Sequence, residues 1–430
     1  MNIKNDINIF SPKDLTGKKI LILAGAKVHC KIVHAAKELG VYTIVTDYLP
    51  IKESPAKQIA DEAWQIDIKD IRTIVNKCKQ ENVDGVLSFC IDPAQIPYQQ
   101  ICEQLNIPCY GTKEQFAIFT NKRLFKDYCQ QHGVDVIPEY SIEDIQNNKV
   151  EYPILVKPTE SRGSRGQTVC YSKEDVKKAI EIASNESLDH KYLIERYMVG
   201  KQDISLAYII IDGTPYLVKI GDRFLGKVKD NLEKQQIATV LPSLYAEEYK
   251  KKVEPKVISM IKSLEMKFGA IFLQGFWENE HMYMYDPGLR FPGSDFDIVT
   301  KEVTGFDSMK SFVYFALTGD AKSCFGNPIN AYLYNNSICL ILSIAVKPGK
   351  ISSFEGFDSL TKDSRIFSAE KRVNINDIIP ASGDIRQRAA EFVAHLSHRQ
   401  DLKDFQSHIY EKLKICNNNN EDMIISKPNF

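Results

Sequence analysis

The sequence predicts an α/β domain followed by a larger α+β region. Strand and helix patterns alternate over the first part of the chain, which indicates a parallel sheet with helical crossovers. Further along, the pattern changes to helices and then to strands in hairpin-like pairs, as in an antiparallel sheet. We therefore predict a Rossmann-like domain over residues 1–112, an α+β unit over 113–315 and a closing lobe over 316–430.

The elements of the first part follow from short apolar runs and from helical periodicity. Buried strands are predicted at 18–26, 41–48 and 84–89, with a short strand at 107–111. Helices are predicted at 27–40, 70–83 and 92–106. The loop after the first strand reads AGAK and lacks the GxGxxG pattern, so a nicotinamide cofactor has little support. Asp47, at the end of the second strand, fits either a ribose contact or a helix cap.

The later elements are predicted from two-residue alternation and from turn residues. Tight turns at Asp212-Gly213 and at 278–280 divide the alternating segments into hairpins. In the closing lobe we predict a strand at 337–349 and one long helix over 384–415. The CNNNNED segment that follows is predicted to form a polar turn.

Composition and charge argue against several classes of protein. The formal net charge is −1 and the pI is about 6.7, so no basic field favours nucleic acid or an anionic membrane. No apolar run approaches the length of a membrane span, and the start of the chain lacks the apolar core of a signal peptide. The 10 cysteines are scattered without a CxxC or zinc spacing. We expect a cytoplasmic protein with reduced thiols.

A glycine-rich, cationic segment follows a buried strand. The ten residues KPTESRGSRG, from 157 to 166, hold three cations and two glycines directly after the apolar run EYPILV. Cations crowded in this way are tolerable when an anion lies among them. Backbone N–H groups of a glycine loop can surround phosphate oxygens. The segment therefore indicates a polyphosphate ligand.

Three further features indicate the same ligand. Lys122 opens a predicted helix together with Arg123. Glu195 ends an apolar strand and Asp203 follows the next turn, and such carboxylates suit an adenine amine and ribose hydroxyls. Gln274 and Asp286 lie on the two strands of a hairpin, and their oxygens are hard ligands for Mg²⁺. Each feature alone also fits an ordinary structural role at the surface. The occurrence of all of them in this order along one chain favours a nucleotide site.

Taken in order, these features resemble the ATP-grasp superfamily, closest to the branch of carbamoyl-phosphate synthase large-subunit-like, biotin carboxylase-like and amino-acid ligase enzymes. The resemblance implies a pre-ATP-grasp N-terminal domain and a two-subdomain clamp with a lid at about 150–200, completed by the C-terminal lobe. It places phosphate-binding cations at Lys122 and Lys157, and a glycine-rich lid at Ser161, Gly163, Ser164 and Gly166. It places adenine contacts at Glu195, Tyr197 and Met198, a ribose contact at Asp203, and Mg²⁺ ligands at Gln274 and Asp286.

The chain departs from the family pattern in one place. The family reads Glu-x-Asn-Pro-Arg, whereas this chain reads DPGLR from Asp286 to Arg290. Gly288 supplies no side-chain ligand where the family has Asn, so we expect a weaker or shifted metal, or one completed by Asp295 or Asp297. Arg290 is suited to hold the substrate carboxylate or acyl phosphate bidentately, with Arg223 a weaker candidate.

The resemblance implies a ligase that uses ATP and Mg²⁺, with Mn²⁺ as a substitute. A carboxylate attacks the γ-phosphate to form an acyl phosphate and ADP, and an amine or similar nucleophile then displaces phosphate. We expect small-molecule carboxylate and amine substrates, with a homodimer as one assembly. Two alternatives stay open: an enzyme that activates bicarbonate, as carbamoyl-phosphate synthases and carboxylases do, and an ATP-binding module that has lost turnover.

Overall fold

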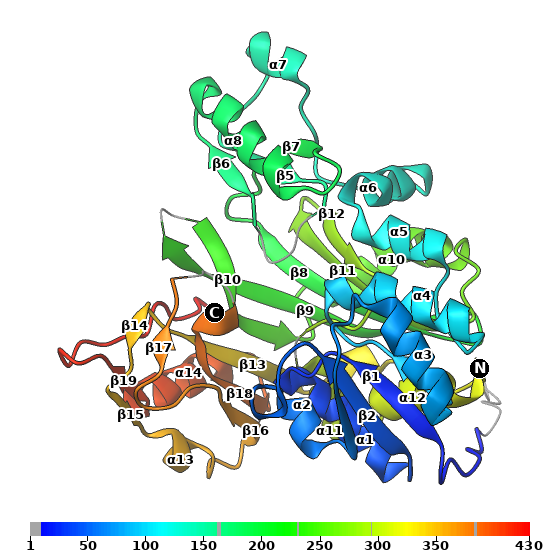
Figure 1. The fold of residues 1–430 in the computed structure, drawn as a ribbon. Coiled ribbons are helices and arrows are strands. Elements are labelled where there is room, and N and C mark those ends of the chain that lie inside the picture. Colours follow the sequence, from blue (N-terminus) through cyan, green and yellow to red (C-terminus); the bar gives the residue numbers. More distant parts are fainter. Residues whose placement is uncertain (1–9, 161–164, 230–231, 294, 382–384) are drawn as a thin grey trace, which may run out of the picture.

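The computed structural model describes residues 10–160, 165–229, 232–293, 295–381 and 385–430. Figure 1 shows three regions: the N-terminal domain in blue, a small subdomain that projects from the top in green, and a long sheet that runs across the molecule to the C-terminal lobe. The predicted order, an α/β domain with a parallel sheet and then an antiparallel α+β region, is confirmed. The residue boundaries between the three predicted parts stay predictions.

The N-terminal domain is built on a parallel sheet that has four strands among the described residues, in the order β3-β2-β1-β4. The strands are β1 (Lys19–Leu23), β2 (Tyr42–Asp47), β3 (Glu62–Gln65) and β4 (Gly85–Leu87). The helices are α1 (Cys30–Glu38), α2 (Pro55–Ile59), α3 (Ile71–Glu81) and α4 (Gln95–Leu105), with 3-10 turns η1 (Lys27–His29), η2 (Ile51–Glu53) and η3 (Asp92–Ala94). β4 is apolar throughout, and β1 is apolar and buried after Lys19, because helices cover both faces of the sheet.

One prediction about this domain is wrong, and one strand was missed. Residues 107–111 do not form a strand, because Pro108 lacks a backbone N–H and the N–H of Tyr110 donates to the hydroxyl of Tyr98 instead. β3 was not predicted, since its sequence EAWQ is short and half polar. It joins the sheet through its parallel pairing with β2.

The green subdomain is a small sheet with helices on one side. Its strands are β5 (Ile154–Pro158), β6 (Thr168–Cys170) and β7 (Tyr192–Arg196), in the order β6-β5-β7, and its helices are α7 (Ile142–Gln146) and α8 (Lys173–Glu186). It has an apolar core of its own, which includes Ile154, Val176 and Ile194. Helices α5 (Lys113–Thr120) and α6 (Lys122–Gln131) connect it to the N-terminal domain.

One antiparallel sheet joins the centre of the chain to its C-terminal part, in the order β12-β11-β8-β9-β10-β13-β18-β16. Its strands are β8 (Gln202–Ile211), β9 (Thr214–Lys229), β10 (Leu232–Leu241), β11 (Phe268–Glu278), β12 (His281–Gly288), β13 (Ile338–Ala345), β16 (Ile366–Lys371) and β18 (Arg388–Leu396). Both predicted hairpins form. Asp212 and Gly213 have φ of 48° and 76°, and Asn279 and Glu280 have 50° and 67°, as the tightest hairpin turns require.

Helices cover both faces of this large sheet. They are α9 (Ala246–Glu248), α10 (Glu254–Lys262), α11 (Phe296–Thr304), α12 (Ser308–Thr318), α13 (Phe357–Leu360) and α14 (Asp401–Lys412), with the turns η4 (Tyr249–Val253), η5 (Ala331–Asn336) and η6 (Ile385–Gln387). Short strands β14 (Gly349–Lys350), β15 (Ser353–Glu355), β17 (Ile378–Ile379) and β19 (Lys414–Cys416) complete the C-terminal lobe. α11 packs on one face with Tyr334 and Val393, and α14 packs on the other with Leu342 and Phe392.

The single long helix predicted over 384–415 is wrong. Its first half is strand β18, which pairs with β13 and β16, and only α14 is helical. The segment RAAEFVAHL consists largely of residues that also suit helices, so its strand conformation is set by the neighbouring strands.

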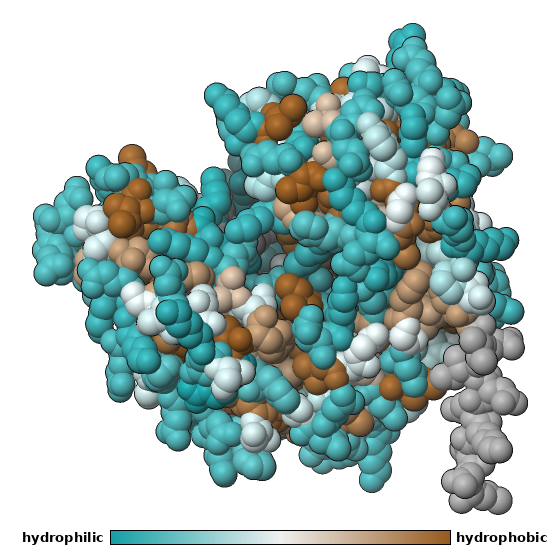
Figure 2. Space-filling model, turned by 90° about the horizontal axis from the view of Figure 1, so that it is seen from below, coloured by the Kyte–Doolittle hydropathy of each residue, from teal (hydrophilic) through white to brown (hydrophobic). Residues whose placement is uncertain are grey.

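The N-terminal domain is fixed against the centre of the chain through α12. A Cβ on Gly85 of β4 would lie 2.4 Å from the carbonyl oxygen of Ala316, so only glycine allows this approach. None of the helices in the described ranges is long and apolar enough to span a bilayer. Seen from below in Figure 2, the surface is mostly hydrophilic, with apolar side chains in small separate groups.

Candidate active site

Two lysines hold one buried carboxylate at the base of the small subdomain. Nζ of Lys157, on β5, lies 2.6 Å from Oε2 of Glu195, on β7, and Nζ of Lys126, on α6, lies 2.6 Å from Oε1. All three side chains are almost fully buried. Burial raises the pKa of Glu195, but the charges of Lys157 and Lys126 outweigh it and lower the pKa. Glu195 by itself balances the charge of only one of the two lysines.

Lys126 is a member of this cluster that the sequence interpretation missed. Its ammonium also lies 2.7 Å from Oε1 of Glu139 and donates to the carbonyl of Ile137 at 2.7 Å. It lies one helical turn after Lys122, so that the i, i+4 spacing of the two lysines on α6 was an available signal. Burial of both lysines on one helix is the unusual feature, since lysine is rarely buried without a partner.

Lys122 opens α6, as predicted. Asn121 caps the helix, because its side-chain oxygen accepts from the backbone N–H groups of Arg123 at 3.0 Å and Leu124 at 3.2 Å. The buried Lys122 ammonium lies 3.9 Å from Oδ1 of Asp286 on β12. The structure thus brings together residues that are far apart in the sequence.

Gln274 and Asp286 are direct partners across the β11–β12 hairpin. Both are partly exposed, with 36% of the Asp286 side chain accessible. Within the described ranges, no group of three or more His, Cys, Asp or Glu side chains is arranged to hold a metal by itself. A pair of hard oxygen ligands nevertheless fits Mg²⁺ bound together with nucleotide phosphates, because Mg²⁺ in such sites takes one or two protein ligands.

Asp203 lies beside this pair but is already bound within the protein. Nη1 of Arg223 on β9 is 2.7 Å from its Oδ2, and the hydroxyl of Tyr285 on β12 donates at 3.2 Å. Burial raises the pKa of Asp203 and the nearby Asp286 adds to this, while Arg223 opposes both. Tyr285 was not predicted. Its position next to Asp286 in the alternating strand β12 is the only sequence signal for it.

The remaining predicted nucleotide contacts lie around β7 and the loop after β5. Tyr197 and Met198 directly follow β7, where the Met198 sulfur accepts from Nη2 of Arg196 at 3.1 Å. Gly166 has φ of 69°, and a Cβ there would lie 2.8 Å from Cγ of Pro158, so the position requires glycine. The predicted lid residues Ser161, Gly163 and Ser164 lie outside the described residues.

Arg290 is held by a residue that was not predicted. Its Nε and Nη2 donate to the two carboxylate oxygens of Asp92, and its Nη1 donates to the carbonyl of Phe291 at 2.8 Å. The guanidinium also lies over the ring of Phe272, 5.4 Å from its centre. Burial lowers the pKa of Arg290, and Asp92 outweighs this and raises it. Asp92 starts η3 after β4, so the N-terminal domain orients this arginine.

Gly288 allows Arg290 to lie where it does. A Cβ on Gly288 would lie 3.1 Å from Cγ and 3.3 Å from Nε of Arg290. Because Asp92, Phe291 and Phe272 already hold this side chain, it has little freedom to move away. The glycine at this departure from the family pattern thus has a packing role.

The alternative metal ligands are committed elsewhere. Lys31 on α1 lies 2.5 Å from Oδ1 of Asp295 and 2.9 Å from Oδ1 of Asp297. Glu278, a further acid at the end of β11, also has partners, because it pairs with Arg196 and Lys201 next to the hairpin turn. The structure therefore gives no support to completion of the metal site by these acids.

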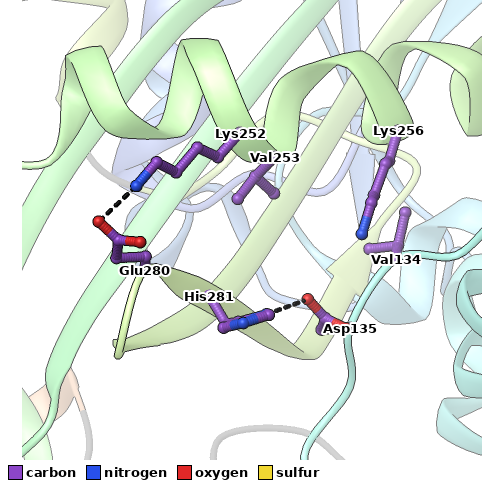
Figure 3. A pocket seen from close by; sticks show the side chains of 7 residues that line it. All are labelled: Val134, Asp135, Lys252, Val253, Lys256, Glu280 and His281. Atoms are coloured by element: carbon purple, nitrogen blue, oxygen red, sulfur yellow. Dashed lines mark hydrogen bonds and ion pairs between the residues drawn. The ribbon is translucent and has the colours of Figure 1, made fainter.

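A pocket at the turn of the same hairpin is separate from these residues. Figure 3 shows that the start of β12 and the helical segment of η4 and α10 contribute side chains to this pocket. Dashed lines mark the contacts between His281 and Asp135 and between Lys252 and Glu280. His281 begins β12, whereas Asp286 lies near the other end of that strand. The pocket is therefore not part of the candidate site.

Two family models match the chain in sequence. Residues 121–317 match the carbamoyl-phosphate synthase L chain, ATP binding domain, and residues 20–101 match the PylC-like, N-terminal domain. The 2-oxoglutarate carboxylase small subunit of Hydrogenobacter thermophilus is 25% identical over 250 residues, which are 53% of this chain and 51% of that protein. Biotin carboxylase 1 of Bacillus subtilis is 23% identical over 228 residues, 48% of this chain and 50% of that protein. The chain thus spans about half the length of these relatives.

Solved structures share the fold over nearly the whole chain. The L-amino acid ligase from Bacillus licheniformis superposes with a TM-score of 0.75 and 15% identity, covering 95% of this chain and 100% of that one. The phosphoribosylglycinamide synthetase from Anaerococcus prevotii gives a TM-score of 0.71 and 17% identity over 93% and 99% of the two chains. At these identities the likeness is one of fold.

Proposed function

We propose that this chain, whose residues 121–317 form an ATP-grasp domain behind a PylC-like N-terminal domain, is an ATP-dependent carboxylate–amine ligase. The predicted resemblance to the ATP-grasp superfamily is confirmed by these two matches. The observation that carries the proposed activity is the cluster of three buried lysines, Lys122, Lys126 and Lys157, around Glu195 and Asp286. Lys157 shares its carboxylate with Lys126, and Lys122 lies 3.9 Å from Asp286, so both ammonium groups have donors left for an anionic ligand.

In this proposal the nucleotide binds between the small subdomain and the large sheet. Lys157 and Lys122 contact its phosphates, Gly166 and the loop before it cover them, and the segment of Tyr197 and Met198 after β7 borders the adenine. The sequence predicts that Glu195 contacts the adenine. In the structure each of its carboxylate oxygens lies beside a lysine, so Glu195 would also orient Lys157. Asp203 would contact the ribose while its carboxylate stays paired with Arg223.

Gln274 and Asp286 would hold Mg²⁺, with Mn²⁺ as a substitute. When bound, the metal neutralises phosphate charge that develops during transfer. Lys122 contacts the same Asp286 carboxylate and would keep it oriented before the metal arrives.

The proposed reaction has two steps. A carboxylate oxygen forms a bond to the γ-phosphorus as the bond to the ADP oxygen breaks, which yields an acyl phosphate. An amine then attacks the acyl carbon, inorganic phosphate leaves, and the amine loses a proton to a base or to water. The protein contributes positioning and charge stabilisation, and the loop after β5 keeps water from the intermediate.

A turnover screen tests this proposal. Purified protein with ATP and Mg²⁺ is offered single carboxylates and amines, amino acids first, and release of ADP and phosphate is measured. We expect release to require both a carboxylate and an amine. We expect Lys157→Ala to need a higher ATP concentration for the same release, with the exposed Lys178→Ala on α8 as the control. Absence of carboxylate-dependent release with any pair contradicts the ligase proposal.

A second candidate has the support of the sequence relatives, two of which are carboxylases by name. An enzyme that activates bicarbonate would release ADP in the presence of bicarbonate without an organic carboxylate. Nucleotide binding without any turnover would favour the third possibility, a module that has lost its chemistry.

A homodimer is also proposed, because the carboxylase domain of the Hydrogenobacter thermophilus relative was solved as a dimer, and light scattering tests it.

A further inference from the structure

A cluster of arginines lies on the large sheet beyond the proposed nucleotide site. Arg223 comes from β9, Arg388 from β18, and Arg372 directly follows β16. The register places Arg223 opposite Asp203, while Arg372 and Arg388 lie on either side of Glu391. Arg223 thus connects the cluster to the nucleotide site.

Arg388 has the least satisfied side chain of the three. Only 12% of it is exposed, yet within the described residues its nearest carboxylate oxygen is Oε2 of Glu391 at 3.7 Å, too far for a hydrogen bond. The same oxygen of Glu391 already accepts from Ser343 at 2.5 Å, and its other oxygen is 3.1 Å from Arg372. The Nε atoms of Arg223, Arg372 and Arg388 are all buried without a hydrogen-bond partner among the described residues.

The electrostatic setting of Arg388 is unfavourable in the absence of a ligand. Burial lowers the pKa of Arg388; Glu391 opposes this, while Arg372 and Arg223 lower the pKa further. Buried donors without partners and neighbouring like charges both cost stability, and an anion placed among them relieves both. The guanidinium fork fits the two oxygens of a carboxylate or phosphate.

Arg290 has fewer donors left for such a group. Three of its five N–H groups already donate, two to Asp92 and one to the carbonyl of Phe291. The cluster around Arg388 has buried Nε donors without a partner among the described residues, whereas Nε of Arg290 donates to Asp92. Lys31 also approaches the cluster, because it contacts Asp295, which in turn interacts with Arg372 and Glu391.

We propose that Arg388, with Arg223 and Arg372 beside it, binds an anionic group of a substrate, either a carboxylate or a phosphate. The assignment to a substrate rests on the proposed ligase function, whereas the anion site itself does not. The substrate would then carry an anionic group that stays unreacted, as a dicarboxylate, an amino acid or a phosphorylated amine does.

Calorimetry tests the site without turnover. Acetate, succinate and inorganic phosphate are titrated into the protein near pH 7, with and without saturating ADP and Mg²⁺. ADP occupies the lysines of the nucleotide site, so binding that persists in its presence belongs elsewhere. The three probes separate a single carboxylate, a dicarboxylate and a phosphate.

We expect saturable binding of succinate or phosphate, weakened at least tenfold in Arg388→Gln and unchanged in Arg72→Gln, which removes an exposed arginine on α3. Arg388→Lys keeps the charge but loses the fork, so we expect an intermediate affinity, and this variant serves if Arg388→Gln does not fold. Absence of saturable binding, or equal affinity in the wild type and the Arg388 variants, overturns the proposal. Anion binding that depends on Arg388 in a protein that does not bind ADP would remove the nucleotide function and leave this site standing.

Discussion

The ammonium of Lys157 lies 2.6 Å from one oxygen of Glu195, while Lys126 lies 2.6 Å from the other. One carboxylate thus serves two cations in a place almost without water. Burial lowers the pKa of Lys157, and Glu195 opposes this change. A nucleotide phosphate would give Lys157 a second anionic partner besides Glu195, which accounts for a buried lysine at the end of β5.

Lys157→Ala should weaken ATP binding by roughly 1 to 3 kcal/mol, the scale of a charge-assisted contact. The loss should fall mainly on affinity, because Lys126 continues to hold Glu195 and the fold is kept. Calorimetry with ATP measures this effect, and Lys178→Ala is the control. Unchanged affinity in Lys157→Ala would remove this lysine from the site.

Lys126→Met should act on stability more than on ATP affinity. The substitution removes the ammonium group that contacts the Ile137 carbonyl and the carboxylates of Glu139 and Glu195. Glu139 keeps its ion pair with Arg123, and Glu195 keeps its ion pair with Lys157. Breaking a buried ion pair costs about 3 to 5 kcal/mol. Urea unfolding measures the change, and a loss below about 1 kcal/mol would contradict this role of Lys126.

Asp286→Asn should reduce Mg²⁺-dependent turnover far more than ATP affinity. The metal stabilises charge that develops at transfer, so that its loss falls on the transition state. Steady-state kinetics at several Mg²⁺ concentrations, beside calorimetry with ATP, separate the two effects. If turnover keeps its full Mg²⁺ dependence, the metal is held by other residues. Asp203, whose pKa is raised in part by the charge of Asp286, is then the next acid to test.

Gly288→Ala should impair the substrate site, where the sequence predicts that Arg290 holds the substrate carboxylate. The new Cβ would press on Cγ of Arg290 at 3.1 Å and disturb its contact with Asp92. We expect KM for the carboxylate to rise severalfold or more. Gly293→Ala is the matched control, since its Cβ would meet only the sulfur of Cys90 at 3.9 Å. Equal kinetics in the two variants would show that Arg290 adjusts freely.

Glu391→Gln should change how stability depends on pH. Burial and the neighbouring Asp295 raise the pKa of Glu391 to about 7, so the folded protein binds a proton that the unfolded chain releases above about pH 4.3. Wild-type stability should therefore fall as pH rises from about 5 to 8, by up to about 3 kcal/mol from this group, and the variant should lack this fall. Urea unfolding across this range measures it, with Glu370→Gln on β16 as the control. Parallel curves for wild type and Glu391→Gln would contradict the prediction.

The buried histidine His29 also makes stability depend on pH, but it does not affect the comparison of wild type with Glu391→Gln. Burial lowers its pKa to about 4, so its contribution to stability rises with pH between about 4 and 6.5. This contribution has the opposite sign and is the same in wild type and variant. It cancels in the difference.

The motif residues of the candidate site were predictable because each occurs in a short, local pattern. Lys122 opens a capped helix, Lys157 ends an apolar strand, and Gln274 and Asp286 follow from the hairpin whose turn the sequence specifies. Strand alternation and helix periodicity depend on neighbouring residues, so the order of an α/β domain and an antiparallel region could also be predicted.

Tertiary structure alone decided what these residues contact. Lys126, Asp92 and Tyr285 each reach the site from another element, and no local pattern states their partners. The same reason applies to β18, whose helix-forming residues pair with β13 and β16, and to Gly288, whose role depends on the position of Arg290. Sequence by itself determined the charged groups of the chain and the elements with a clear local pattern, such as the two hairpins and the strands of the parallel sheet other than β3. Burial and long-range packing, which sum contacts between distant segments, decided which of those charges meet out of water.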